Sequence, residues 1–480
     1  MLALGVGVVL PAAAAAKRGP ARVKAPSITQ IGCLVNCAEG SPIAVQPGGK
    51  LQIWGSGLKR GMIATFPRKS KVRRSKRTVT AVVRQTAGVF GVTVPLLARS
   101  GRFKVALGRG PASNAVGPIK IQKPAPVVKP PAPGRAQGDS PFDTTVMWIW
   151  YVSKSSGGTV AGIAAQAKQA GVGTIIVKAS DGGSAFAGQF TPQLVADLHA
   201  QGLKVCGYSY VYGNNPAAEA AQGARVAQTG ADCLLIDAEG EYEGKYAAAT
   251  TYIRQLRAAV GDSFPVGIAP FPYVDYHAAF PYSVFLGPGG AQYNLPQMYW
   301  KDIGTSVDAN FDHTYTWNRI YDRPIYPLGQ TYQDPPSTDL IRFRQLAKAY
   351  GAGGVSWWSW QETKPYAWTA VGQAVPPLTD GFQPTQNWPA LKRGSKGDPV
   401  VWLQMHLLAA GQTLTVNGLF DAATDTAVRN MQTGAGLPVT GITDAGTWDK
   451  ALKYAPTAVD WTATAKPAKA AYAAKAKKNT

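Results

Sequence analysis

Asp237 and Glu239 lie two residues apart at the end of the apolar run Cys233-Leu-Leu-Ile-Asp-Ala-Glu239. Because side chains alternate between the two faces of a β-strand, both carboxylates would project the same way, roughly 6 to 7 Å apart. Two ionised carboxylates at that distance repel each other, which raises the pKa of one of them. A protonated acid beside an ionised one is the pairing that glycoside hydrolysis uses. The pair predicts this chemistry; the alternative is that Asp237 caps the next helix and Glu239 is a solvated loop residue.

The elements that must position this pair alternate between strand and helix signals eight times within residues 143–376. Alanine-rich helical stretches separate several of the strands, and Gly171, Gly202 and Gly230 follow three of them as helix stops. Eight such units predict a (β/α)8 TIM barrel. A doubly wound open sheet is the alternative, but no glycine-rich phosphate loop follows the first strand. The expected strands are 146–152, 174–179, 204–211, 233–238, 265–270, 295–300, 325–329 and 354–359.

In such barrels the active site lies at the carboxyl ends of the strands. Those ends carry aromatic rings beside amides and carboxylates, which suits a sugar, because its C–H faces stack on rings and its hydroxyls need hydrogen bonds. Any single tryptophan is more simply a core residue, and Lys178 could form a plain ion pair. We expect Glu239 and Asp237 to be catalytic and the substrate-binding residues to be Trp148, Trp150, Lys178, Asp181, Tyr208, Tyr210, Gln297, Tyr299, Trp300, Trp358 and Trp360, with Gln330 and Tyr332 at the seventh strand end.

Three stretches, Ile175-Ile-Val-Lys-Ala-Ser-Asp-Gly182, Gly202-Leu-Lys-Val-Cys-Gly-Tyr-Ser-Tyr210 and Leu234-Leu-Ile-Asp-Ala-Glu239, resemble the second, third and fourth units of the family 25 lysozymes among the glycoside hydrolases. The resemblance implies cleavage of the β-1,4 bond after N-acetylmuramic acid in peptidoglycan, with Glu239 as proton donor and Asp237 assisting. The family carries an aspartate at the end of its first strand, where this chain has Trp148-Ile-Trp-Tyr-Val-Ser-Lys154. Acids that could approach from other loops are Glu241, Glu243, Asp302 and Glu362.

Residues 388–453 carry a second set of motifs in order, among them Leu391-Lys-Arg-Gly-Ser-Lys-Gly397, Val401-Trp-Leu-Gln404 and Asn417-Gly-Leu-Phe420. This segment resembles the peptidoglycan-binding domain type 1, a small three-helix module found on wall hydrolases. The resemblance implies peptidoglycan as a partner. Leu403 with Leu407, and likewise Val428 with Met431, recur at helical spacing and predict the core of the module.

The N-terminal part reads as short strands between turn signals over residues 26–122, which predicts a β-sandwich. The stretch Val45-Gln-Pro-Gly-Gly-Lys-Leu-Gln-Ile-Trp-Gly-Ser-Gly-Leu58 resembles the immunoglobulin-like IPT/TIG fold, which implies a spacer or binding module. Residues 123–141 form a proline-rich, semi-rigid linker, and a softer linker covers about 375–388. Residues 454–480 form a basic Ala/Lys tail.

The length of 480 residues predicts two to four domains, and 49 basic against 27 acidic residues give a net charge of +22. Residues 68–77 and the tail carry much of this charge. The run 68–77 has none of the interleaved aromatic residues that are typical of nucleic-acid binding. The positive charge could bind a polyanionic wall polymer or an anionic lipid surface. The alternative is that it has no specific partner and belongs to a solvated hairpin and a disordered tail. No nucleic-acid partner is expected.

Residues 1–16 are apolar and end in Ala14-Ala-Ala16 before Lys17-Arg18, which is typical of a secretory signal and too short to span a bilayer. We therefore expect export to the extracellular space or cell wall, without a membrane span. In that compartment Cys33 and Cys37 are expected to form a disulfide, whereas Cys206 and Cys233 could be bridged or free. No metal-site spacing is present, and no cofactor is expected.

Together these patterns predict an exported, multidomain cell-wall glycoside hydrolase of the muramidase kind, held on its substrate by the C-terminal module. Two alternatives stay open. The barrel could grip wall glycan without cleaving it, as the missing first-strand aspartate suggests, or it could hydrolyse another extracellular polysaccharide.

Overall fold

The computed structural model describes residues 24–37, 44–67, 78–86, 89–95, 98–108, 110–121 and 140–463. The predictions for the signal-like segment 1–16, the basic run 68–77, nearly all of the proline-rich linker and residues 464–480 lie outside this part. The chain divides into two compact units, residues 1–125 and 126–480. Each unit is described by itself.

The first unit is built from β-strands in the described residues. Its sheet has the order β1-β2-β5-β4-β3-β6-β7, and β2 also pairs with β7, in parallel. Phe103 and Val105 on β6 are buried while Arg102 and Lys104, which alternate with them, are exposed, as in a strand with one face on a core. The unit is all-β as expected, and its immunoglobulin-like assignment stays a prediction. The strands are β1 (Ser27–Cys37), β2 (Ala44–Ser56), β3 (Ile63–Pro67), β4 (Thr78–Thr86), β5 (Val89–Thr93), β6 (Gly101–Ala106) and β7 (Val116–Ile121).

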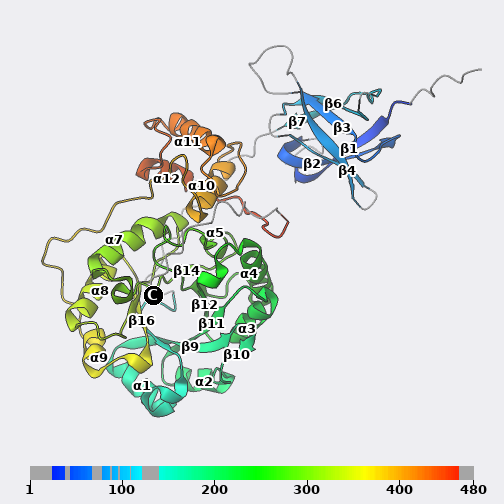
Figure 1. Cartoon of the computed structure of the whole chain (residues 1–480). Coiled ribbons are helices and arrows are strands. Elements are labelled where there is room, and N and C mark those ends of the chain that lie inside the picture. Colours follow the sequence, from blue (N-terminus) through cyan, green and yellow to red (C-terminus); the bar gives the residue numbers. More distant parts are fainter. Residues whose placement is uncertain are drawn as a thin grey trace, which may run out of the picture. The chain divides into compact units, whose positions relative to one another are not determined.

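The second unit contains a ring of parallel strands with helices outside it (Figure 1). The described order is β14-β13-β12-β11-β9-β8-β16-β15, and the bridges Asn294↔Ile325 and Gln297↔Leu328 join the two ends. The ring is thus a barrel, as the eightfold alternation predicts. Its strands are β8 (Thr145–Ile149), β9 (Val172–Asp181), β11 (Lys204–Val211), β12 (Cys233–Ala238), β13 (Val266–Ile268), β14 (Tyr293–Asn294), β15 (Leu328–Gln330) and β16 (Val355–Trp358), and β10 (Ser184–Ala185) pairs only with β9.

The helices around the barrel begin where the sequence supplies caps. The side chains of Thr191 and Asn215 accept hydrogen bonds from the backbone N–H of the third residue of α2 and of α3, and a proline follows each cap at the first helical position. The helices are α1 (Val160–Gln169), α2 (Pro192–Ala200), α3 (Pro216–Gln228), α4 (Tyr246–Val260), α5 (Tyr282–Phe285), α6 (Trp300–Ile303), α7 (Val307–Asn318), α8 (Ser337–Ala349) and α9 (Pro365–Gly372).

Alternation along β12 decides where the acid pair lies. Cys233 and Leu235 pack with Trp148 and Tyr208 in the cluster that fills the barrel interior. Leu234 and Ile236 pack instead with the helices outside. Asp237 has the parity of the inner set, so the strand presents it inside the barrel at its carboxyl end.

The sixth expected strand, 295–300, is wrong in its extent. The strand is β14, only Tyr293–Asn294, and Trp300 already begins helix α6. Pro296 has no N–H to donate to a sheet, so the ladder stops before it and resumes only as the isolated bridge at Gln297.

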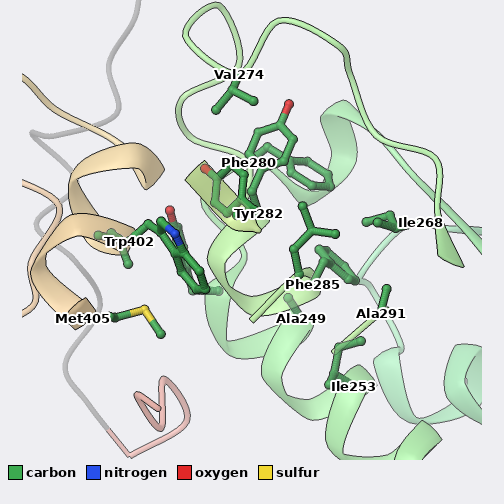
Figure 2. Packing of buried hydrophobic residues seen from close by; sticks show 14 of the residues in the cluster. Ala249, Ile253, Ile268, Val274, Phe280, Tyr282, Phe285, Ala291, Trp402 and Met405 are labelled. Carbon is green, nitrogen blue, oxygen red and sulfur yellow. The ribbon is translucent and has the colours of Figure 1, made fainter. Parts of the chain in front are cut away.

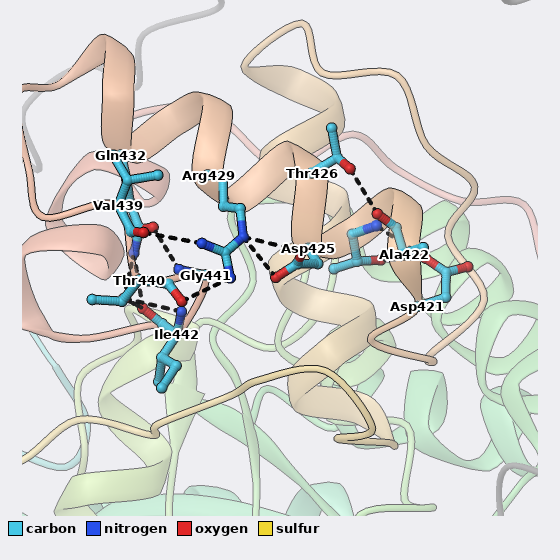
Figure 3. A network of polar contacts seen from close by, with 11 residues as sticks. Asp421, Ala422, Asp425, Thr426, Arg429, Gln432, Val439, Thr440, Gly441 and Ile442 are labelled. Atoms are coloured by element: carbon cyan, nitrogen blue, oxygen red, sulfur yellow. Dashed lines mark hydrogen bonds and ion pairs between the residues drawn. The ribbon is translucent and has the colours of Figure 1, made fainter.

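The C-terminal domain has three helices in the described residues, α10 (Asp398–Ala409), α11 (Ala422–Gly434) and α12 (Ala445–Ala451), as its motifs predict. Its loops are fixed by side chains from the helices. Figure 3 shows Arg429 of α11, which pairs with Asp425 and donates to the carbonyl oxygens of Val439 and Thr440 at 3.0 Å each. In the described residues no helix is long and apolar enough to cross a membrane.

Candidate active site

A cavity of about 690 Å³ opens at the carboxyl ends of the barrel strands. This is the end at which the sequence predicts the site, and a cavity of this size holds a ligand of a few rings. The expected residues that line the cavity are Trp148, Trp150, Lys178, Tyr208, Tyr210, Asp237, Glu239, Gln297, Tyr299 and Trp358.

The acid pair is joined by one amide. The Nε2 atom of Gln297 donates to Oδ1 of Asp237 at 3.2 Å and to Oε1 of Glu239 at 3.0 Å, and also to the carbonyl oxygen of Ala269 at 2.9 Å. Those two carboxylate oxygens can therefore be no farther apart than the sum of their two distances to the nitrogen. Asp237 is 8% exposed and Glu239 is half-buried, so Glu239 is the member of the pair that meets the cavity more openly.

Both carboxyl groups hold protons more tightly than free side chains do. Burial raises the pKa of Asp237 well above its usual range, the charge of Glu239 adds to this, and Lys178 opposes it. Burial also raises the pKa of Glu239; the hydrogen bond from Gln297 and the charge of His277 oppose that rise, whereas Glu241 adds to it. The site therefore keeps an acid available at higher pH than an exposed carboxyl group would.

Lys178 lines the cavity and also forms an ion pair with Asp181. Its Nζ lies 2.6 Å from Oδ2 of Asp181, whose other oxygen accepts from the Tyr212 hydroxyl at 2.7 Å. Burial opposes ionisation of Asp181, but these two hydrogen bonds prevail and its pKa is lowered. Asp181 does not line the cavity, so the structure gives it the role of a partner to Lys178 rather than of a substrate ligand.

Aromatic rings form the floor and one wall of the cavity. Trp148 and Tyr208 are buried in the floor, with ring centroids 4.9 Å apart, and Trp358 lies against both. Among the described residues, Nε1 of Trp148 and the hydroxyl of Tyr208 are buried without a hydrogen-bond partner. Trp150, 41% exposed, carries its ring at the rim. The floor is thus made of buried aromatic side chains, and the rim offers an exposed aromatic face.

Two of the expected tryptophans do not line the cavity. Trp300 lies in α6, buried, and its Nε1 donates to Asp339 at 3.0 Å. Trp360 lies in the short helix Trp360–Glu362, buried, and its Nε1 donates to Ser156 at 3.2 Å. In both cases the residue begins a helix rather than continuing a strand, and its side chain packs in the cluster outside the barrel strands.

The structure adds a wall that strand ends alone do not predict, the segment 269–281 between β13 and α5. It contributes Phe271, Tyr273, Tyr276 and His277 to the cavity. A signal was present in the sequence, since Phe271-Pro-Tyr-Val-Asp-Tyr-His277 is dense in aromatic residues immediately after the fifth strand. Asp302 and Tyr332 also line the cavity and hydrogen-bond each other.

Three of the four acids that could replace the first-strand aspartate do not themselves line the cavity, and each is hydrogen-bonded to another side chain. Glu241 accepts from the Tyr210 hydroxyl at 3.1 Å, Glu243 lies 2.9 Å from His277, and Glu362 accepts from Ser359 at 2.9 Å. Asp302 is the one among these four that the described cavity includes. Its oxygens are taken by Tyr332 and Gln333.

Of the two alternatives for Cys206 and Cys233, bridged or free, the structure shows the bridged form. Cys206 and Cys233 stand opposite each other on β11 and β12 and form a disulfide. Cys33 is disulfide-bonded as well, but the side chain of Cys37 lies outside the described part, so the Cys33–Cys37 pairing stays a prediction. No cluster of three or more potential metal ligands occurs among the described residues.

Comparison with known proteins gives one domain assignment. No curated protein matches the chain. Similar solved structures include a chitinase from Chromobacterium violaceum ATCC 12472 (12% identity, 48% of this chain and 98% of that one, TM-score 0.37). Others are the spore cortex-lytic enzyme SleL of Bacillus cereus (10%, 47% and 73%, 0.36) and a fungal endo-beta-N-acetylglucosaminidase (13%, 49% and 99%, 0.36).

All three TM-scores are below 0.5. The match to a family model is independent of them and covers residues 396–451. Those residues, the predicted C-terminal module, belong to the family described as "Putative peptidoglycan binding domain".

Proposed function

We propose that this protein is a cell-wall glycoside hydrolase that cleaves glycan strands of peptidoglycan, with Glu239 as the general acid. The observation that carries the proposal is the carboxyl pair Asp237 and Glu239, linked by Gln297 in an aromatic-lined cavity. A carboxyl group with a raised pKa can protonate a glycosidic oxygen near neutral pH. Aromatic rings around it suit the C–H faces of a sugar.

The geometry of the pair favours a retaining reaction. The two carboxylate oxygens that share Gln297 are closer together than the roughly 6.5 to 9.5 Å that separates the carboxyl groups of inverting enzymes. An inverting reaction needs the wider spacing to hold its attacking water, so the geometry of the pair disfavours Asp237 as an inverting base.

Asp237 is also a poor nucleophile for a covalent intermediate. It projects from the same strand as Glu239 and shares the same amide, whereas an acid and a nucleophile must flank the sugar ring from opposite sides. An N-acetylated aminosugar supplies a nucleophile of its own in its 2-acetamido oxygen, the substrate-assisted route. Asp237 would then orient that acetamido group for attack.

The C-terminal domain supports the choice of substrate and location. A peptidoglycan-binding domain on the same chain as the aromatic-lined cavity supports peptidoglycan as the partner and an extracellular or cell-wall location. Muramidase specificity and kinship with the family 25 lysozymes rest on the sequence resemblance alone. No cofactor enters the proposed reaction.

One observation favours a second function, glycan binding without cleavage. The described cavity presents no acid in the place of the first-strand aspartate, and Asp302 is occupied by Tyr332 and Gln333. Hydrolysis of another N-acetylated polysaccharide would keep the chemistry and change only the substrate.

The experiment that separates these functions incubates purified protein with insoluble peptidoglycan, with chitin and with a polysaccharide that lacks acetamido groups. New reducing ends are measured, and the terminal sugar is identified by mass spectrometry. Release from peptidoglycan with N-acetylmuramic acid at the new reducing end supports the muramidase proposal. Release of reducing ends from chitin alone would show that chitin, not peptidoglycan, is the substrate. Pelleting with peptidoglycan without release of reducing ends from any glycan would favour glycan binding without cleavage.

A further inference from the structure

The segment 269–281 brings charge as well as aromatic surface to the cavity. The ring of His277 stacks on Phe271 with centroids 3.6 Å apart, and its Nδ1 lies 2.9 Å from Glu243. The charge of His277 is one of the influences on the pKa of Glu239. The position of this segment therefore affects both the shape of the cavity and the proposed acid.

Two consecutive carbonyl groups hold the end of the segment. The oxygen of Ala279 accepts from the N–H of Gly244, in the loop that follows Glu239, at 2.8 Å. The oxygen of Ala278 accepts from the N–H of Asp398, in the C-terminal domain, at 2.7 Å. The approach is close enough to require glycine at position 397, where φ is +101° and a Cβ would lie 2.5 Å from the Cβ of Ala278.

Asp398 is the centre of this contact. Its carboxylate is completely buried and accepts four hydrogen bonds: from the N–H and the hydroxyl of Ser283 at 2.8 and 2.6 Å, from Tyr321 at 2.7 Å and from Tyr246 at 2.9 Å. The three donor residues belong to separate elements of the barrel, in and around α5, α7 and α4. A buried carboxylate is tolerated when its acceptor sites are filled in this way, and losing one partner is costly.

Apolar packing surrounds the buried carboxylate. Figure 2 shows Trp402 and Met405 of α10 facing Tyr282 and Phe285 of α5, and these residues belong to one buried cluster. The indole of Trp402 also donates to the carbonyl oxygen of Ile320. A domain on a flexible tether would not share a core with the barrel.

The connection between barrel and domain is held along its length too. Arg342 pairs with Asp380 at 2.7 Å, and Arg319 donates to the carbonyl oxygen of Thr385 at 2.7 Å. The segment expected to be a soft linker thus lies against α7 and α8.

We propose that the C-terminal domain is a structural part of the glycan cleft, and that Asp398 is a positioning residue which fixes the segment 269–281 against the cavity. The proposal deepens the proposed function and rests on it for its catalytic consequence. The domain then presents bound peptidoglycan at a fixed orientation to Glu239, and it supports turnover even of a substrate too short to reach it.

The test compares Asp398→Asn with Tyr321→Phe and with a control, Asp425→Asn, which alters the Arg429 ion pair inside the C-terminal domain. Asparagine keeps the size of the side chain but accepts fewer hydrogen bonds. Tyr321→Phe removes a single donor and decides the question if Asp398→Asn does not fold. The full chain is used throughout.

Hydrogen exchange measured by mass spectrometry is the first readout, because it needs no activity. We expect faster exchange in residues 269–285 of Asp398→Asn, a smaller change in Tyr321→Phe and wild-type exchange in Asp425→Asn. The second readout is kcat/KM on a soluble N-acetylated tetrasaccharide, which should fall about 10- to 100-fold in Asp398→Asn, with pelleting on peptidoglycan retained.

Unchanged exchange in residues 269–285 would overturn the proposal, and so would faster exchange with wild-type kcat/KM. If wild-type protein turns over no glycan, the proposed function fails by itself. In that case the positioning role is decided by hydrogen exchange in residues 269–285 and by the affinity of the tetrasaccharide for the cavity. Faster exchange in Asp398→Asn together with wild-type affinity would refute the positioning role.

Discussion

Gln297 controls the proton affinity of the proposed acid, and replacing it with methionine tests that directly. Methionine fills similar space but donates no hydrogen bond. In the wild-type protein, the hydrogen bond from Nε2 of Gln297 to Glu239, at 3.0 Å, stabilises the ionised carboxylate. Removing this bond therefore raises the pKa of Glu239 further.

The magnitude follows from the strength of a hydrogen bond to a charged group, about 1.5 to 3 kcal/mol. Glu239 is half-buried and Gln297 shares its amide among three acceptors, so the lower end applies, about 1.5 kcal/mol, which is roughly a tenfold change in proton affinity. A general acid works while protonated, and activity is lost as the pH rises through its pKa. The alkaline limb of kcat/KM should therefore move up by about one pH unit.

The assay measures kcat/KM on the soluble tetrasaccharide across pH. The matched control is Gln361→Met, because the carboxamide of Gln361 contacts Tyr151, Ser155 and the Trp150 backbone but no carboxylate. Its alkaline limb should stay at the wild-type pH. An alkaline limb that moves down in Gln297→Met, or that stays in place, would refute the assignment of that limb to the Glu239 and Asp237 pair.

Three further predictions use the same protein. Asp237→Asn should lower kcat on the tetrasaccharide roughly 10²-fold, because it removes the carboxyl group that orients the reacting acetamido group; a kcat within about twofold of wild type would contradict that role. Trp150→Ala removes a half-exposed ring at the rim and should raise KM about tenfold with kcat within about twofold, whereas a selective loss of kcat would exclude a stacking role. Replacing Cys206 and Cys233 with alanine should lower the free energy of unfolding in urea by about 3.5 kcal/mol, since the disulfide spans 27 residues; a loss below about 1 kcal/mol would show that the bridge does not stabilise the barrel.

The parts of the site that the sequence predicts are those that follow from strand periodicity. Parity along residues 233–238 places Asp237 inside the barrel, and the carboxyl ends of other strands bring Lys178, Tyr208 and Gln297 to the same cavity. Periodicity needs only local information, and barrel closure does the rest.

The parts it misses depend on contacts between distant residues. Trp300 and Trp360 follow strands in sequence, but helices begin there and turn their rings outward. The wall 269–281 has no periodic pattern. Nothing in the sequence around Asp398 shows that Tyr246, Ser283 and Tyr321 converge on it, because they precede it by 152, 115 and 77 residues.

The central claim is that Glu239 donates a proton to a wall glycan. Its most direct test compares wild-type protein with Glu239→Gln on insoluble peptidoglycan and follows both pelleting and new reducing ends. Glutamine can still accept the hydrogen bond from Gln297, so binding should be unchanged, while release falls about 10²- to 10⁴-fold. Equal pelleting with release by wild type alone is the predicted result. Release by Glu239→Gln at the wild-type rate would contradict the claim.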